Sequence, residues 1–291
     1  MFLSFKSQLA DYWELTKPGV TFMVIISVLG GFYLGSRGRM DVVLLIHALV
    51  GSWLVAGGTN ALNQLIERNF DMKMKRTRMR PLPAGRLSFL QVTIFATAIS
   101  ILGIAHLCMA VNWLTGLLAA LTLASYIFIY TPLKRTTPLS TIIGAVPGAL
   151  PAMGGWTATR GDITIEALVL FAILFFWQLP HFLAIAWIYR EDYARGGFSV
   201  MTVLDKSGIQ TGWHIVLNCL ALLSVSLLPT LLGLTGVIYF CGALLLGVGF
   251  LIAGIRVAIQ KTNHNAKQLL HASIIYLPIL ITLMFIDKTP T

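Results

Sequence analysis

Residues 60–85 read NALNQLIERNFDMKMKRTRMRPLPAG and mark the end of a long apolar segment. Within them Asn63, Glu67 and Asp71 recur at intervals of four residues. A helix of 3.6 residues per turn places these three side chains on one face. Ionisable groups at the end of a membrane segment are costly to keep there. Two carboxylates and an amide on one stripe therefore predict a bound cation.

Magnesium is the natural candidate for this stripe, because it takes hard oxygen ligands and often shares them with substrate phosphates. Six basic residues follow between positions 73 and 86, more than membrane orientation alone requires. We expect at least two of them to bind an anion, with Arg76 and Arg80 favoured and Lys73 included; the alternative is a set of topological anchors. Carboxylates, cations and a bilayer together indicate a lipid diphosphate as substrate.

The bulk composition predicts an integral membrane protein. The chain is 57% hydrophobic and 11% charged, with mean hydropathy +0.81, too apolar for a soluble domain of 291 residues. Apolar windows that can span a bilayer recur along it, and such segments must be helical. We expect one all-α domain over residues 1–291, with nine spans near 18–35, 42–64, 88–109, 112–131, 139–157, 163–189, 210–231, 234–256 and 268–287.

The basic residues predict the orientation of these spans. With the N-terminus in the cytoplasm, 17 of the 21 Lys and Arg residues fall inside and only four outside, which favours N-in and C-out. We therefore expect a multi-pass protein of a bacterial inner (plasma) membrane. Residues 1–17 are expected to be cytoplasmic, either an amphipathic segment on the inner leaflet or an ordinary tail. Nucleic-acid binding is not indicated, because no basic soluble module is visible.

A second acidic cluster follows the sixth apolar segment. Glu191 and Asp192 come directly after it, four helices beyond the first stripe. We expect helices two and six to face each other across a cavity, where two metal ions would clamp a diphosphate. Asp192 is our first choice for the second ion and Glu191 our second choice.

Two further polar sites lie near apolar segments. Lys134 and Arg135 could bind the leaving diphosphate, although ordinary positive-inside anchoring would also explain them. His181 and Trp177 lie within the apolar segment 163–189, and an intramembrane polar group is a functional hypothesis by default. The alternative for His181 is a hydrogen bond to a neighbouring backbone group.

Five blocks of sequence resemble the intramembrane UbiA-type prenyltransferases. They are the Asn63-x3-Glu67-x3-Asp71 stripe, TRMRPLPAG at 77–85, YTPLKR at 130–135, WQLPHF at 177–182 and EDYARGG at 191–197. Glu67 in place of the commoner Asp is typical of the branch that acts on haem. The resemblance runs from about residue 10 to residue 285. The usual DxxxD form of the second motif is absent here, so its role passes to Asp192 and then Glu191.

The resemblance implies nine helices around a central cavity that opens to the cytoplasmic leaflet. It implies Mg²⁺-dependent transfer of a farnesyl group from farnesyl diphosphate to a vinyl group of haem B, which gives haem O. His181 would orient the porphyrin or bind its iron. The resemblance also implies a place in cytochrome oxidase maturation, with haem A synthase or terminal oxidase assembly factors as partners.

Two rival functions remain at this point. The same scaffold prenylates aromatic acids such as quinone precursors, and Glu67 together with the His181 helix favours haem over them. The other rival is a transporter or a non-catalytic haem-binding membrane protein, which would use polar groups on discontinuous helices for ions. The basic loop directly after the acid stripe disfavours that second rival.

Overall fold

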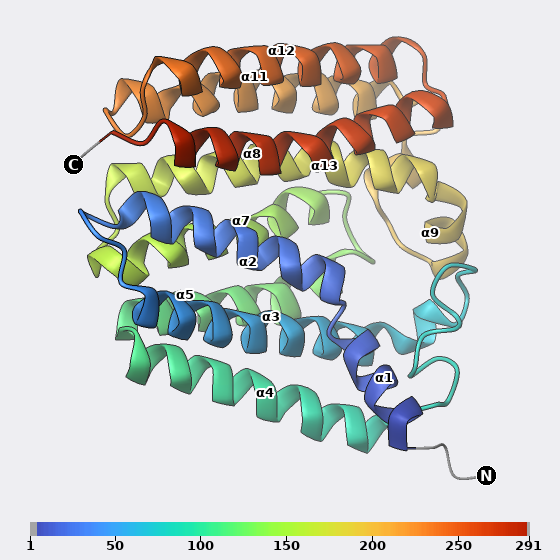
Figure 1. The fold of residues 1–291 in the computed structure, drawn as a ribbon. Coiled ribbons are helices and arrows are strands. Elements are labelled where there is room, and N and C mark those ends of the chain that lie inside the picture. The colour runs from blue at the N-terminus through green and yellow to red at the C-terminus, as the bar shows by residue number, and fades with distance from the viewer. Residues whose placement is uncertain (1–4, 290–291) are drawn as a thin grey trace.

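The computed structural model describes residues 5–289, which fold almost entirely into helices (Figure 1). The long helices are α2 (Pro18–Gly35), α3 (Val42–Asp71), α4 (Phe89–Ala110), α5 (Trp113–Ala124), α7 (Ser140–Arg160), α8 (Ile165–Ile188), α11 (Ile209–Leu231), α12 (Val237–Ile259) and α13 (Asn263–Ile286). The short elements are α1 (Phe5–Leu15), the π-helical segment η1 (Ser125–Tyr130), α6 (Thr131–Leu133), α9 (Arg190–Gly196) and α10 (Met201–Leu204).

Among the described residues, eight helices are long and apolar enough to cross a membrane. One of them is the continuous stretch Trp113–Leu133, formed by α5, η1 and α6. The all-α, multi-pass fold is confirmed, whereas the count of nine spans is not. The remaining long helix, α7, corresponds to the expected span 139–157, but it carries two internal prolines and is less apolar than the eight. Its small and polar residues suit contact with other helices more than contact with lipid.

Helix α7 packs tightly against α2, and two glycines make the approach possible. A Cβ atom added to Gly155 would lie 2.0 Å from the carbonyl oxygen of Val28. A Cβ added to Gly31 would lie 2.0 Å from the carbonyl oxygen of Ala152. Backbone therefore meets backbone from both sides, as in the small-residue contacts of membrane helix pairs.

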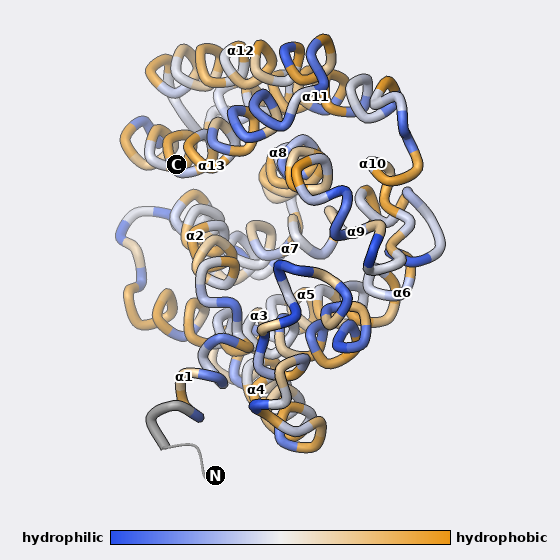
Figure 2. Tube along the Cα trace, turned by 90° about the vertical axis from the view of Figure 1, so that its right-hand side faces the viewer, coloured by the Kyte–Doolittle hydropathy of each residue, from blue (hydrophilic) through white to orange (hydrophobic). Residues whose placement is uncertain are grey.

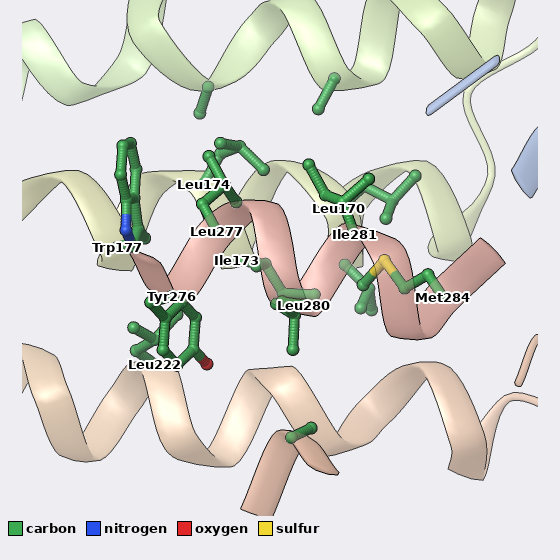
Figure 3. Packing of buried hydrophobic residues seen from close by; sticks show 14 of the residues in the cluster. Leu170, Ile173, Leu174, Trp177, Leu222, Tyr276, Leu277, Leu280, Ile281 and Met284 are labelled. Atoms are coloured by element: carbon green, nitrogen blue, oxygen red, sulfur yellow. The ribbon is translucent and has the colours of Figure 1, made fainter. Parts of the chain in front are cut away.

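The largest apolar cluster joins α8 to α13, with α11 and α12 beyond them. In Figure 3, Leu170, Ile173 and Leu174 of α8 lie beside Leu277, Leu280 and Ile281 of α13. These side chains are buried and close-packed between the two helices, and this packing fixes the relative position of α8 and α13. This cluster anchors the C-terminal half of the bundle, and the functional residues at the end of α8 depend on it.

The polar connections gather at one end of the bundle, which we call the α9 end. Figure 2 looks onto this end and shows α1, α6, α9 and α10 there. The loop 72–88, which carries the basic run, also lies here because α3 ends at Asp71 and α4 begins at Phe89. Segments far apart in sequence thus meet at the C-terminal end of α3.

The α2–α7 contact predicts that Gly155→Ala lowers the stability of the protein. The added methyl group would overlap a backbone carbonyl, so the helices must separate at a cost of about 1–3 kcal/mol. The measurement is thermal unfolding of the purified protein in detergent. Gly154→Ala is the matched control, because a Cβ there has no neighbour within 4 Å. Equal unfolding temperatures for the two variants would contradict the tight contact.

Candidate active site

The stripe of Asn63, Glu67 and Asp71 lies on the last turns of α3 and is buried, with exposures of 1%, 7% and 1%. Each member is held by a cation from another part of the chain. Lys134 Nζ donates to Glu67 Oε1 at 2.8 Å. Arg80 Nη1 donates to Asp71 Oδ2 at 2.8 Å. The burial of two carboxylates on one helix is thus matched by nearby positive charge, as it must be.

The donor set of the stripe fits a hard divalent cation. Asp71 Oδ1 is buried and has no hydrogen-bond partner among the described residues. Such an orphaned carboxylate oxygen is costly unless an ion or ligand reaches it. No group of three or more His, Cys, Asp or Glu side chains comes together within residues 5–289. A Mg²⁺ ion at the stripe would therefore need phosphate oxygens or waters to complete its coordination, which is its usual habit.

Lys134 is positioned by an irregular turn at the end of the fourth span. The π-helical segment η1 leads into α6, and Thr131 at its junction donates to Tyr126 O at 2.8 Å and accepts from Asn63 Nδ2 at 3.2 Å. π-helical turns inside α-helices are frequent at functional sites. Burial would lower the pKa of Lys134, but the carboxylate of Glu67 raises it well above its usual value. Lys134 therefore carries a positive charge.

Lys17 is a site residue that sequence reasoning missed. Its Nζ donates to Asn63 Oδ1 at 3.1 Å, so it is the third cation at the stripe. It caps α2 with φ +47°, the only positive value at a non-glycine residue in the described chain. Burial, together with the charge of Arg80, lowers the pKa of Lys17 to about 7. The available signal was a single lysine directly before Pro18 at the start of a span.

The chain segment around Lys17 is fixed to α3 by buried amides. Asn60 Nδ2 donates to Thr16 O at 3.2 Å, and Gln64 Nε2 donates to Leu15 O at 2.8 Å. These bonds satisfy backbone carbonyls at the α1–α2 junction, which would otherwise be buried without partners. They hold the ammonium of Lys17 over the stripe.

Helix α1 also braces the basic loop. Arg86 Nε donates to Asp11 Oδ1 at 2.8 Å, and Arg86 Nη2 donates to Glu14 Oε2 at 2.6 Å. The same guanidinium donates to Met79 O at 2.7 Å. Residues 5–17 are thus tied to α3 and to the loop 72–88. The part of the expected amphipathic segment at residues 1–4 lies outside the described residues.

The other expected anion-binding residues form no ion pair with the carboxylates of the stripe within residues 5–289. Lys73 Nζ and Arg135 Cζ lie 5.9 Å and 4.8 Å from the centroid of the Phe70 ring. Arg76 Cζ lies 5.0 Å from the centroid of Tyr189. All three basic side chains are exposed, and these distances are typical of cation–π contacts. They add exposed positive charge to the α9 end.

The two acidic residues of α9 lie in different surroundings. Asp192 is buried and accepts from Lys75 N at 3.3 Å, while Arg195 contacts the same carboxylate oxygen. Burial would raise the pKa of Asp192, but the hydrogen bond from Arg195 lowers it overall. Glu191 is exposed and lines a pocket on another side of α9. The structure therefore brings Asp192 against the loop that follows Asp71, and it does not bring Glu191 there.

Trp177 and His181 both face α13. Trp177 Nε1 donates to Ser273 O at 2.8 Å, and His181 Nδ1 lies 2.7 Å from Ser273 Oγ. The two rings are stacked with centroids 5.2 Å apart. Figure 3 shows Trp177 within the α8–α13 packing. The indole of Trp177 is buried and its N–H is already hydrogen-bonded to α13. In contrast, Nε2 of His181 has no hydrogen bond among the described residues.

The chain was compared with known proteins. A model of the UbiA prenyltransferase family matches residues 24–277. A protein of Solibacter usitatus (strain Ellin6076) named "Protoheme IX farnesyltransferase" is 46% identical over 287 residues, which are 96% of this chain and 98% of that protein. The sequence similarity therefore extends over almost the full length of both proteins.

Two solved structures share the fold. A digeranylgeranylglyceryl phosphate synthase has a TM-score of 0.78 at 16% identity, over 97% of this chain and 98% of the other. A UbiA homologue from Archaeoglobus fulgidus, bound to GPP and Mg²⁺, has a TM-score of 0.66 at 14% identity, over 94% and 99%. At such low identity these likenesses establish the fold alone.

The buried pair of Lys134 and Glu67 predicts strong coupling between the two side chains. Lys134→Gln leaves the Glu67 carboxylate buried without its cation and should cost about 3–5 kcal/mol of unfolding free energy. The double variant Lys134→Gln with Glu67→Gln should recover most of that loss, because no isolated charge remains. The coupling is measured by denaturant unfolding of the wild type, Lys134→Gln, Glu67→Gln and the double variant.

Glu14→Gln provides a control for the same measurement. The Glu14 side chain is 48% exposed in its pair with Arg86, so its loss should cost less than about 1 kcal/mol. Additive losses from Lys134→Gln and Glu67→Gln, with no recovery in the double variant, would contradict the buried pair.

Proposed function

The chain belongs to the UbiA prenyltransferase family, and we propose that it transfers a farnesyl group from farnesyl diphosphate to a vinyl group of haem B, forming haem O and releasing diphosphate. The 46% identical relative named for this activity supports the choice of substrates. The observation that carries the chemistry is the convergence of Lys17, Arg80 and Lys134 on one buried acid stripe. An anionic leaving group is what such an arrangement is built to receive.

We propose Mg²⁺ as the cofactor, held by Asn63, Glu67 and Asp71. The orphaned oxygen of Asp71 supports this assignment, as does the Mg²⁺ that accompanies GPP in the Archaeoglobus homologue. Bound there, the ion would neutralise diphosphate charge and act as a Lewis acid toward it. Asp192 is proposed for a second ion on the strength of its place beside the loop that follows Asp71.

The cations of the site act by exchanging partners. In the described state Lys134 and Arg80 neutralise Glu67 and Asp71. When a diphosphate binds, its oxygens offer these two side chains a second set of acceptors, and Lys17 can leave the amide of Asn63 for the same purpose. Charge accumulates on the diphosphate as the allylic C–O bond breaks, so these contacts strengthen toward the transition state.

Aromatic rings stand next to the cations. Lys134 Nζ lies 4.4 Å from the centroid of Tyr130, and Tyr126 packs against Tyr130 with centroids 4.9 Å apart. We propose that these rings face the allylic carbon, where their π faces stabilise the developing carbocation. The apolar surroundings also exclude water, which would otherwise quench the cation before the acceptor reacts.

The acceptor reacts as an electron-rich alkene. The vinyl group of haem B attacks the allylic carbon, water then adds to the resulting cation, and loss of a proton to the released diphosphate gives the hydroxyl of the product. His181 is our candidate for orienting the porphyrin or binding its iron, since its Nε2 is free of hydrogen bonds in the described chain while Ser273 fixes the ring. We propose that the α9 end faces the cytoplasm of a bacterial cell, in keeping with the distribution of basic residues.

The function is tested by incubating the purified protein with haem B, farnesyl diphosphate and Mg²⁺. We expect a haem whose mass has increased by a farnesyl group plus a hydroxyl group. Asp71→Asn should lower turnover by at least about 100-fold and abolish the Mg²⁺-dependent binding of a non-reactive farnesyl thiodiphosphate. The control Asp162→Asn, at an exposed residue following α7, should leave both unchanged.

Other results of this experiment would redirect the proposal. Prenylation of an aromatic acid in place of haem B would move the acceptor and keep the metal site. Normal turnover and normal Mg²⁺-dependent binding in Asp71→Asn would remove the metal assignment.

Lys17 predicts a pH dependence of diphosphate binding. Its pKa of about 7 means that the ammonium is partly deprotonated above neutrality, while a bound diphosphate favours the charged form. Binding therefore takes up a proton, and affinity should fall as the pH rises above about 7. Calorimetric titration with farnesyl thiodiphosphate between about pH 6 and 8.5 measures this slope.

Two variants separate the contribution of Lys17 from the titration of the ligand itself. Lys17→Met should bind the diphosphate more weakly and lose the part of the pH dependence that comes from Lys17. Lys17→Arg stays charged throughout this pH range, so it should keep its affinity and also lose that part of the pH dependence. Parallel pH profiles for the wild type and Lys17→Met would show that Lys17 does not contact the diphosphate.

A further inference from the structure

A pocket separate from the stripe lies at the α9 end, bounded by the end of α8, by α9, by α10 and by the loop between α12 and α13. Its volume is about 490 Å³, and its lining includes Trp187, Arg190, Lys206 and Lys261. None of these residues takes part in the stripe on α3 or in its ion pairs. We call this space the α8–α10 pocket.

Three cations line the α8–α10 pocket without a carboxylate partner. Within residues 5–289, Arg190, Lys206 and Lys261 form no ion pair within 4.0 Å. The pocket also contains Asp205, but its carboxylate accepts from Ser207 Oγ and from the backbone and side chain of Thr211. The carboxylate of Asp205 is therefore occupied by hydrogen bonds at the start of α11. Glu191 also lines the pocket, is exposed and forms no ion pair among the described residues, so three cations face two carboxylates and a small excess of positive charge remains for a ligand.

The inner side of the pocket holds donors without acceptors. The indole Nε1 of Trp187 and the Nη1 of Arg190 are both buried, and neither has a hydrogen-bond partner among the described residues. Arg190 Cζ lies 4.7 Å from the centroid of the Trp187 ring. Buried N–H groups without acceptors are rare in native proteins and require an explanation. An anionic oxygen entering the pocket would supply the missing acceptor after a small shift of these side chains.

The turn between α10 and α11 packs closely against Trp187 and Lys261. Gly208 has φ +68°, and a Cβ there would lie 2.5 Å from the Trp187 ring and 3.0 Å from Lys261 Cδ. The backbone between α10 and α11 therefore presses directly on the indole and on the stem of Lys261. This close contact fixes the indole of Trp187 and the stem of Lys261 on the same side of the pocket.

The α8–α10 pocket is separate from the proposed diphosphate site. Asp192 of α9 contacts the loop after Asp71, whereas Arg190 and Glu191 line the pocket. Neighbouring residues on a helix point about 100° apart, so α9 presents different faces to the two sites. A ligand in the pocket can thus be present together with a diphosphate at the stripe.

We propose that the α8–α10 pocket binds an anionic oxygen group, a carboxylate or a phosphate, through Lys206, Lys261, Arg190 and the indole N–H of Trp187. Two sources have this chemistry. One is the propionate carboxylates of the haem acceptor, and this source rests on the proposed function. The other is the phosphate of an anionic lipid in the adjoining leaflet, which is independent of that function.

The test compares Lys261→Gln with Lys267→Gln, which removes the same charge from an exposed residue of α13 outside the pocket lining. For the carboxylate, the full-length protein is titrated spectrophotometrically with haem B and with its dimethyl ester. For the phosphate, the shift in unfolding temperature is measured with phosphatidylglycerol and with phosphatidylcholine. Trp187→Phe is a second variant, since it removes one donor and keeps an aromatic ring.

We expect the wild type to prefer the anionic member of one of the two pairs of ligands, either haem B over its dimethyl ester or phosphatidylglycerol over phosphatidylcholine. Lys261→Gln and Trp187→Phe should weaken that preference, by about tenfold in affinity where a charged donor is lost, while Lys267→Gln keeps it. Loss of preference for haem B over its ester identifies the carboxylate, and loss of the phosphatidylglycerol effect identifies the lipid phosphate. If neither pair separates Lys261→Gln from Lys267→Gln, the proposal is overturned.

Binding in this test does not depend on turnover, so the two proposals can fail separately. A wild-type protein that makes no haem O but loses its anion preference in Lys261→Gln would refute the proposed reaction and keep the pocket. Normal haem O synthesis, with no anion preference in any of the proteins, would keep the proposed reaction and refute the anion-binding pocket.

Discussion

The burial of two carboxylates at the end of α3 is the constraint on which the rest of the site depends. Glu67 and Asp71 cannot remain ionised in this position without compensation, because the desolvation of each costs several kcal/mol. The compensation comes from Lys134 after the fourth span and from Arg80 in the loop after α3. Both segments, together with the α1–α2 junction, must therefore reach the same end of the bundle. The buried charge thus explains why the polar connections collect there.

The charge balance of the site is also suited to exchange. Two carboxylates face two permanent cations, and Lys17 is a third whose charge depends on its surroundings. A site that is close to neutral can accept a metal ion and a diphosphate together, since the ion would replace the cations at the carboxylates and the cations would pass to the phosphate oxygens. The same residues then serve the stability of the protein before binding and the reaction after it.

Much of this arrangement could be predicted from the sequence, where the signal is local. Hydropathy located the spans, and a four-residue period placed Asn63, Glu67 and Asp71 on one buried face. The ninth expected span, 139–157, exists as the helix α7, but it is not confirmed as a membrane span, because the glycines that pack it against α2 and its two prolines lower its hydropathy. The apolar pattern of a helix indicates which residues avoid water. It does not indicate whether those residues contact lipid or another helix.

The contacts made over long separations in sequence could not be predicted. Lys17 was counted as a positive-inside residue, and only the bend at φ +47° brings it to Asn63, 46 positions away. Ser273, which orients His181, is 92 positions from it. Glu191 and Asp192 formed one cluster in the sequence, yet on a short helix they face different surroundings. These relations depend on the tertiary structure of the bundle.

The central claim is that the cations of the stripe exchange carboxylates for a diphosphate. A structure of the protein with Mg²⁺ and farnesyl thiodiphosphate tests it most directly. The account predicts a metal ion in contact with Asn63, Glu67 and Asp71, with Lys134 and Arg80 moved onto phosphate oxygens. A bound diphosphate elsewhere in the protein, with the Lys134–Glu67 and Arg80–Asp71 pairs still intact, would contradict it.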